Sequence, residues 1–196
     1  MENLRLTTDA LDPLIELDTV VSYQEVLLND IPAQHPVRLF SDFWISNKSD
    51  SFVPLRGAIE PTKIPAILPW LLLLEVIEIE NKQQFRYRLT GTGCRELFGI
   101  DFTGKLLGDG LTPDGADARF REFGKVVETS QVVYSSSKLP IADRSFLNVY
   151  RGVFPVSTNG YQVNQIFVVI AHEELALDQV RQPARPHALQ ARSSIY

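Results

Sequence analysis

The sequence predicts an α+β fold: a five-stranded antiparallel sheet with helices on one face and an additional helix on the N-terminal side. A β-hairpin pattern covers residues 71–91, and three further strand patterns follow one another at 131–139, 146–156 and 162–172. Helical patterns lie before the hairpin and between the two groups of strands. Because the first two and the last three strands are consecutive, crossover helices cannot alternate with them as in a parallel sheet. We therefore expect antiparallel pairing.

A helix with one strongly aromatic face is predicted at residues 36–47. Phe40, Phe43 and Trp44 share this face, and Pro36 suits the first turn of a helix. A helix face this apolar packs either on its own sheet or on a neighbouring protein. We take these three aromatic residues as the candidate interface of a homodimer or of a complex with a partner.

The hairpin follows a linker punctuated by prolines. Residues 71–80 begin with a continuous apolar run and end in strict alternation with glutamates, which predicts a strand whose far end emerges into water. In the second half of the hairpin, Tyr87 and Leu89 alternate with Arg88, as expected for a strand with two different faces.

Two helices are predicted between the hairpin and the later strands. The shorter one covers 93–98, with Thr92 as its cap and Gly99 at its end. Thr112 and Pro113 suit the cap and first residue of a longer helix. The apolar stripe of this longer helix comprises Ala116, Phe120, Phe123 and Val127.

The net charge of −5 over 196 residues is distributed unevenly along the chain. Residues 1–30 hold seven acidic residues against Arg5, whereas residues 177–196 hold three arginines against Asp178. We expect an acidic arm at 1–35, a nearly neutral domain at 36–176 and a flexible basic tail at 177–196. The charge balance argues against nucleic acid as a partner.

Cysteine content and hydropathy indicate the class of protein. The single cysteine excludes an intrachain disulfide framework and a multi-cysteine zinc site, so a reducing compartment is expected. The first residues show no basic segment followed by an apolar stretch, and the longest apolar run, 67–74, is too short to span a bilayer. We expect a cytoplasmic protein without a membrane span.

Three segments between residues 56 and 108 carry a resemblance to a known family. They are the proline-rich approach with Glu60-Pro61, the segment Tyr-Arg-Leu-Thr-Gly-Thr at 87–92 and the segment Phe-Gly-Ile-Asp-Phe-Thr-Gly at 98–104. In order and spacing they resemble the bacterial stand-alone PAS-domain family, formerly a family of unknown function. The resemblance extends over about residues 36–172, and Glu60-Pro61 stands where the family usually has Asp-Pro.

This resemblance implies a sensory or regulatory fold with no catalytic motif to transfer. PAS domains generally bind a small molecule between sheet and helices or relay a signal through partner contacts. Our first hypothesis is therefore a stand-alone module that acts through protein–protein contacts in bacterial signalling. The second is a sensor that binds an apolar or anionic small molecule, and an enzyme of unrecognised type is the third and least favoured.

The candidate ligand pocket is expected between the sheet and the aromatic residues of the helices. It comprises Tyr87, Phe98, Phe102, Phe120, Phe123 and Val127. This lining suits a small hydrophobic ligand or simply a filled core, and we favour the filled core.

Arg88 and Arg56 form a second candidate site. Arg88 alternates out of phase with Tyr87, so a helix at 36–47 that covered its face of the sheet would bury a cation that needs a partner. Arg56, Glu60 and Glu75 lie on or near the same approach, which favours a structural salt-bridge lock. A clamp for an anionic ligand is the alternative.

No catalytic residue, cofactor or metal site is predicted. Cys94 superficially matches the photoactive cysteine of flavin-binding photoreceptors, but the Asn before it and the Gln after it are missing, so we expect a structural thiol. His35, His172 and His187 lack metal-ligand spacing, and His35 is expected to cap a helix or lie at the surface. The serines lack a neighbouring base, and the glycine-rich segments lack the lysine of a phosphate loop.

Overall fold

The computed structural model describes residues 23–48, 53–139 and 147–177, and within them a six-stranded antiparallel sheet in the order β1-β4-β5-β6-β2-β3. The predicted α+β fold is confirmed, with one strand more than the five predicted. The extra strand, β1, is only two residues long and has no hydrophobic period that a sequence could reveal. The strands are β1 (Gln24–Glu25), β2 (Leu71–Ile79), β3 (Lys82–Thr90), β4 (Val133–Lys138), β5 (Asn148–Val156) and β6 (Gln165–His172).

The helices α1 and α3 begin after side-chain caps, whereas Thr92, predicted as the cap of the short helix, is the first residue of α2 and follows Gly91. His35 accepts a hydrogen bond from the backbone N–H of Val37 at 3.2 Å, and Thr112 accepts one from Gly115 at 3.3 Å. None of the described helices is long and apolar enough to cross a membrane. The α-helices are α1 (Pro36–Ser46), α2 (Thr92–Phe98) and α3 (Pro113–Thr129), and the 3-10 helices are η1 (Leu28–Asp30), η2 (Arg56–Ala58), η3 (Pro61–Lys63) and η4 (Pro65–Trp70).

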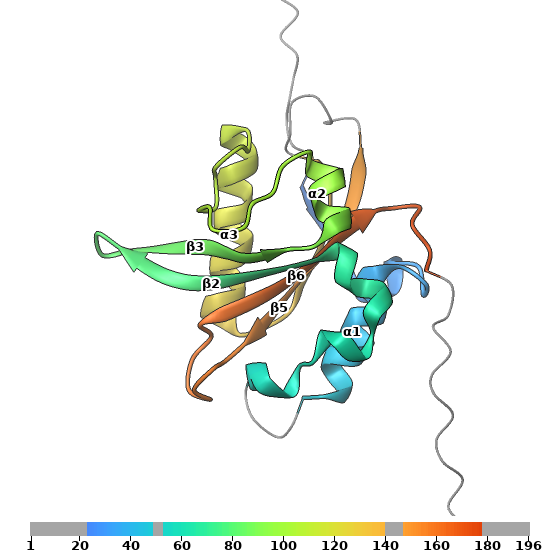
Figure 1. Cartoon of the computed structure of the whole chain (residues 1–196), viewed down its shortest axis with the longest axis horizontal. Helices are drawn as coiled ribbons and strands as arrows, with labels where there is room; N and C mark the ends of the chain where they lie inside the picture. The colour runs from blue at the N-terminus through green and yellow to red at the C-terminus, as the bar shows by residue number, and fades with distance from the viewer. Residues whose placement is uncertain (1–22, 49–52, 140–146, 178–196) are drawn as a thin grey trace, which may run out of the picture.

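Helices cover both faces of the sheet (Figure 1). Along β6, Phe167 and Val169 point into a core shared with α1 and η4, whereas Ile166 and Val168 point into a core shared with α2 and α3. Because both faces are buried, the central strands are apolar throughout rather than alternating. The α1 helix, predicted as an extension, thus closes a second face of the sheet.

The aromatic face of α1 is used inside its own chain. Phe40 and Trp44 are buried, and the Phe40 ring lies 4.8 Å from that of Phe154 and 5.6 Å from that of Phe167. The prediction of a free interface is therefore wrong for Phe40 and Trp44, because the second face of the sheet supplies the apolar surface that this helix needs. Phe43 is half-buried beside them.

The α3 helix buries a different face from the predicted stripe. Phe123 is fully buried, but Ala116, Phe120 and Val127 lie at the border of the buried face. The helix is rotated because two charged side chains point inward. Its buried residues are Gly115, Ala118, Arg119, Glu122, Phe123 and Val126.

The outer strand β3 has its middle covered by residues 104–107. The backbone N–H of Tyr87 donates to the carbonyl of Lys105 at 3.0 Å, and the carbonyls of Tyr87 and Phe85 accept from Gly104 and Leu107, each at 2.8 Å. These outward-facing backbone groups of Phe85 and Tyr87 are thus paired within the chain, as buried or partly buried backbone groups require.

Candidate functional site

Three charged side chains are buried together between the sheet and α3. Arg119 is 3% exposed, and Glu122 and Arg151 are each 2% exposed. Arg119 and Glu122 are three residues apart on α3, so both point to the same side of the helix. Arg151 lies in the middle of β5, on the face that also carries Val149 and Val153 and that packs against α3.

Glu122 lies between the two arginines. Its Oε2 is 3.2 Å from Nε of Arg119 and 3.6 Å from Nη1 of Arg151, and its Oε1 accepts a hydrogen bond from Ser135 at 2.6 Å. Nη1 of Arg151 also donates to the hydroxyl oxygens of Ser135 and Ser137, at 3.5 and 3.4 Å. The cluster therefore fastens α3 to both β4 and β5.

The cluster holds an uncompensated positive charge inside the protein. A guanidinium group does not lose its proton in proteins, so two arginines outweigh one glutamate even when Glu122 is ionised. Burial raises the pKa of Glu122, whereas the charge of Arg119 and the hydrogen bond from Ser135 act in the opposite direction. Any protonation of Glu122 would increase the net positive charge further.

Arg119 has hydrogen-bond donors that are not used. Its Nε lies within ion-pair distance of Glu122 but outside hydrogen-bonding geometry, and neither Nη1 nor Nη2 finds an acceptor among the described residues. Oε2 of Glu122 also makes no hydrogen bond there. Since nearly all buried polar groups in folded proteins are hydrogen-bonded, this arrangement is costly in isolation and requires an explanation.

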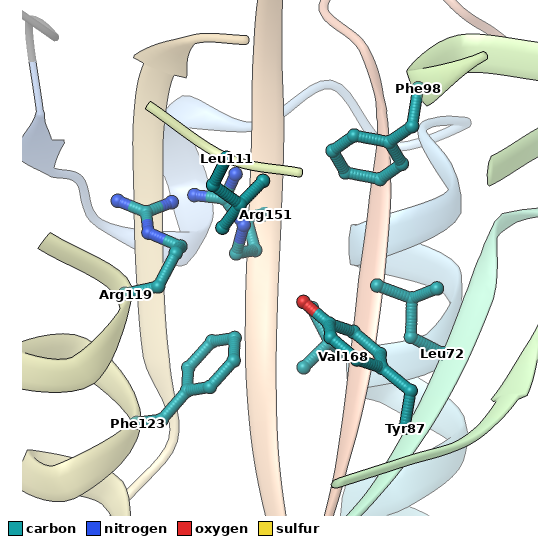
Figure 2. Close-up of a pocket in the computed structure, with 8 residues that line it drawn as sticks. All are labelled: Leu72, Tyr87, Phe98, Leu111, Arg119, Phe123, Arg151 and Val168. Carbon is teal, nitrogen blue, oxygen red and sulfur yellow. The ribbon is translucent and has the colours of Figure 1, made fainter. Parts of the chain in front are cut away.

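A cavity lies beside the two arginines (Figure 2). Its volume is about 10 Å³, close to the smallest space that holds one water molecule. Figure 2 shows the Tyr87 hydroxyl pointing toward the same space. Besides Arg119 and Arg151, the cavity is lined by Leu72, Tyr87, Phe98, Leu111, Phe123 and Val168.

Tyr23 covers the outer side of Arg119. The guanidinium carbon lies 5.1 Å from the centre of the Tyr23 ring, a cation–π contact. Two residues later, Oε1 and Oε2 of Glu25 accept hydrogen bonds from Nζ of Lys125 at 2.7 and 2.8 Å. These bonds connect β1 to α3. The burial of Tyr23 and the nearby Glu122 charge raise the pKa of the Tyr23 phenol, so the ring remains neutral.

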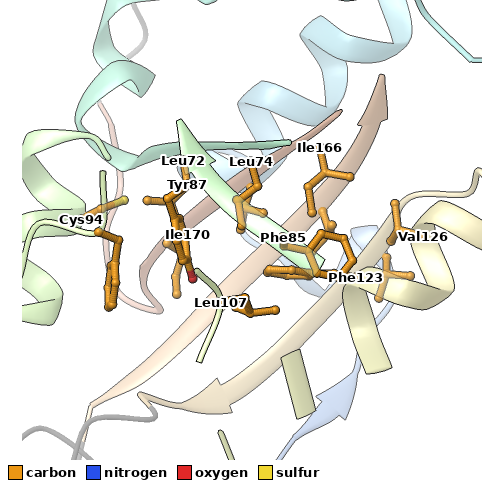
Figure 3. Packing of buried hydrophobic residues seen from close by; sticks show 14 of the residues in the cluster. Leu72, Leu74, Phe85, Tyr87, Cys94, Leu107, Phe123, Val126, Ile166 and Ile170 are labelled. Carbon is orange, nitrogen blue, oxygen red and sulfur yellow. The ribbon is translucent and has the colours of Figure 1, made fainter. Parts of the chain in front are cut away.

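The six residues of the predicted pocket gather in one hydrophobic cluster, part of which Figure 3 shows. Tyr87, Phe98 and Phe123 line the cavity itself. Phe102 is fully buried and stacks on Tyr87 with ring centres 5.0 Å apart, and Phe120 and Val127 pack around the rim of the cluster. Whether these residues contact a ligand remains a prediction, since side chains fill nearly all of this space.

Cys94 belongs to the same cluster and is fully buried. Burial raises the pKa of its thiol far above the ordinary range, so it remains protonated and unreactive. No group of three or more histidine, cysteine or acidic side chains able to hold a metal ion occurs within the described residues.

Arg56 and Arg88 have different partners and do not line the cavity. Arg88 is largely exposed and pairs with Glu75 at 3.5 Å, so α1 does not bury it. Arg56 donates to the carbonyl of Ile59 at 3.0 Å and stacks over the ring of Phe167 at 4.7 Å. The structure thus shows an Arg88–Glu75 pair but does not join Arg56 to it.

The sequence analysis missed Arg119, Glu122 and Arg151. Two signals could have found them. Arg151 is the charged residue within an otherwise apolar strand segment at 149–156. Arg119 and Glu122 are oppositely charged at a spacing of three, on the same side of the helix as Phe123.

A family model described as a PAS domain matches residues 33–148. The matched range contains Tyr87, Arg119 and Glu122, and it ends at the beginning of β5, before Arg151. A search of curated proteins finds no match to this chain.

Proposed function

Because this chain belongs to the PAS domain family, we propose that it is a regulatory module that senses a small molecule in the cavity beside Arg119 and Arg151. The family supports a sensory or regulatory role in general. The choice of this cavity rests on one observation in the structure. Arg119 lines the cavity, and its buried Nη1 and Nη2 atoms find no acceptor among the described residues.

Buried hydrogen-bond donors without an acceptor are typical of a binding site in the absence of its ligand. Buried ion pairs contribute little to stability, so an apolar residue of similar size at position 119 would serve the stability of the core at least as well as arginine does. Pockets that recognise small molecules combine apolar walls with a few convergent polar groups. Here the walls are aromatic and aliphatic, and two guanidinium groups supply the polar side.

Native mass spectrometry of the full chain, purified from the cells that make it, tests this proposal. We expect an additional mass that is retained under native conditions, is lost on denaturation, and is absent from the Arg119→Met variant. An unliganded protein whose melting temperature does not change with any compound of a broad metabolite panel would contradict the proposal.

We further propose that the module passes its signal on through contact with a second copy of itself, at a surface around the β5–β6 turn. Tyr161 is 93% exposed and Leu55 is 48% exposed. The two lie close together, because Leu55 pairs with Ser157 in a β-bridge and its Cδ2 approaches Gly160, the neighbour of Tyr161. Exposed apolar side chains that adjoin one another are typical of protein contacts.

Light scattering at increasing concentration tests this second proposal. We expect a dimer that the double substitution Leu55→Glu, Tyr161→Glu dissociates, whereas Leu89→Glu, at an exposed position on β3, leaves it intact. A monomer over the whole concentration range would contradict it. The ligand proposal would be unaffected by that result.

A further inference from the structure

We propose that the ligand is a small monoanionic carboxylate with an apolar body, bound by the guanidinium group of Arg119. This inference rests on the function proposed above and names the chemical class of the ligand. It is argued from the charge of the cluster, the free donors, the lining of the cavity and the position of Tyr23.

The charge of the cluster favours a single negative charge. Arg119 and Arg151 together carry two positive charges, and Glu122 supplies one negative charge between them. A monoanion would bring the buried cluster to neutrality, whereas a neutral ligand would leave a cation buried without a counterion. An uncompensated buried charge is among the most costly arrangements in a protein interior.

The free donors favour a carboxylate. Nη1 and Nη2 of Arg119 have no acceptor among the described residues, and a guanidinium edge with two free N–H groups matches the two oxygens of a carboxylate. Arg151 differs, because its Nη1 already donates to Ser135 and Ser137. We therefore assign the direct contact to Arg119 and a supporting charge to Arg151.

The walls of the cavity favour an apolar body on this carboxylate. Away from the arginines, the lining is formed by Leu72, Phe98, Leu111, Phe123 and Val168. Only the Tyr87 hydroxyl offers a further hydrogen bond, and Figure 2 shows it pointing into the space. A strongly hydrated anion such as phosphate would lose its water here without enough donors to replace it.

The small volume of the cavity implies that binding enlarges it. About 10 Å³ holds no more than one water molecule, so a carboxylate enters only if part of the wall moves. Tyr23 is the side chain best placed to do so, because it covers Arg119 from the outside and directly precedes the two-residue edge strand β1. Binding would therefore be coupled to displacement of β1.

The test uses the full chain and follows the side-chain Nε–Hε signals of its arginines by NMR, together with the melting temperature. The probes are butyrate, its neutral counterpart butyramide, and inorganic phosphate. We expect butyrate to shift the Arg119 signal saturably and to raise the melting temperature by several degrees (~3–6 °C) near saturation, with butyramide and phosphate inactive.

Matched variants assign the effect to the site. Arg119→Met should abolish the response to butyrate, whereas Arg121→Met, an exposed arginine on the same helix, should retain it. Glu122→Gln removes the competing negative charge and should tighten butyrate binding about tenfold, a change equal to about 1.4 kcal/mol. Tyr23→Ala should speed binding, because it removes the side chain that covers Arg119.

Four outcomes would overturn the inference. Equal responses to butyrate and butyramide would show a ligand cavity without anion recognition, which leaves the proposed function standing. A response to phosphate but not to butyrate would show that the site binds a different class of anion from the proposed carboxylate. A butyrate response that Arg119→Met and Arg121→Met share would indicate surface association. No response to any probe would also contradict the anion site, and native mass spectrometry would then decide the proposed function separately.

Discussion

Arg151 on β5 and Glu122 on α3 face each other across the boundary between sheet and helix, with Nη1 3.6 Å from Oε2. Through this pair and the neighbouring Arg119, the position of α3 on the sheet depends on charge as well as on apolar packing. A change of charge at the cluster, by ligand or by substitution, therefore acts on the contact between two layers of the fold.

Arg119→Met should leave the free energy of unfolding unchanged or raise it by about 1–2 kcal/mol. The substitution removes a buried cation without acceptors and leaves Glu122 paired with Arg151. Urea denaturation at neutral pH measures the effect, with Arg121→Met as a surface control expected to stay within about 0.5 kcal/mol. A loss of several kcal/mol would show that Arg119 is a structural residue.

Phe40→Ala should destabilise the protein by about 3–5 kcal/mol without altering its state of association. The Phe40 ring is buried against Phe154 and Phe167, so the substitution opens a cavity between α1 and the sheet. Denaturant unfolding and light scattering measure the two effects. Ile45→Ala, at an exposed position of the same helix, should change stability by less than about 0.5 kcal/mol.

His35 should make stability depend on pH between about 4 and 6.5. Burial lowers the pKa of His35 from 6.5 to about 4, helped by the charge of His172. Its Nδ1 accepts the N–H of Val37 and its Nε2 lies 3.1 Å from the carbonyl of His172, so the folded state favours the neutral ring. The stabilisation is present above pH 6.5 and is lost as the pH falls toward 4, by about 3 kcal/mol in total.

The comparison of His35→Asn with the unmodified protein measures this contribution. Asparagine can also cap a helix but does not titrate, so the difference in unfolding free energy between the two proteins should change across this pH range. His172→Asn serves as the control, since the His172 ring is half-buried, accepts the N–H of Glu174, and its charge is the smallest of the causes that shift the pKa of His35. Parallel pH profiles for His35→Asn and the unmodified protein would contradict the prediction.

Two glycines should respond to alanine in opposite directions. At Gly91, a Cβ atom would overlap the backbone carbonyl oxygens of Leu68 and Pro69, so Gly91→Ala should cost about 3 kcal/mol or more. At Gly124, within α3, a Cβ atom would meet open space, so Gly124→Ala should stabilise by about 0.5–1 kcal/mol. Thermal unfolding distinguishes the two. A neutral Gly91→Ala would mean that η4 can move away from α2.

The local elements were predictable because their signals are local. The boundaries of α1 and α3 follow from Pro36 and from Thr112 with Pro113, and the hairpin follows from alternation along residues 71–91. Local signals did not, however, predict that helices cover both faces of the sheet. The continuous apolar run of β6 indicates burial on both sides, but only tertiary contacts reveal that α1 provides the second cover.

The candidate site was predicted in part. The aromatic residues were expected to lie together because each belongs to an element with an apolar pattern. In the structure they form one cluster. The charged cluster was missed because hydrophobic periodicity treats arginine and glutamate as surface residues, so the stripe on α3 was placed on Phe120 and Val127. Buried charge has no hydropathy signature and is seen only when its partners on other elements are known.

The covering of β3 by residues 104–107 has a consequence for the behaviour of this protein at high concentration. An exposed outer strand offers a template onto which strands of other molecules can add, and this is a common route to aggregation. Here residues 104–107 of the same chain occupy the hydrogen-bonding groups of Phe85 and Tyr87 in the middle of β3. The fold itself therefore blocks the addition of a further strand at the middle of this edge.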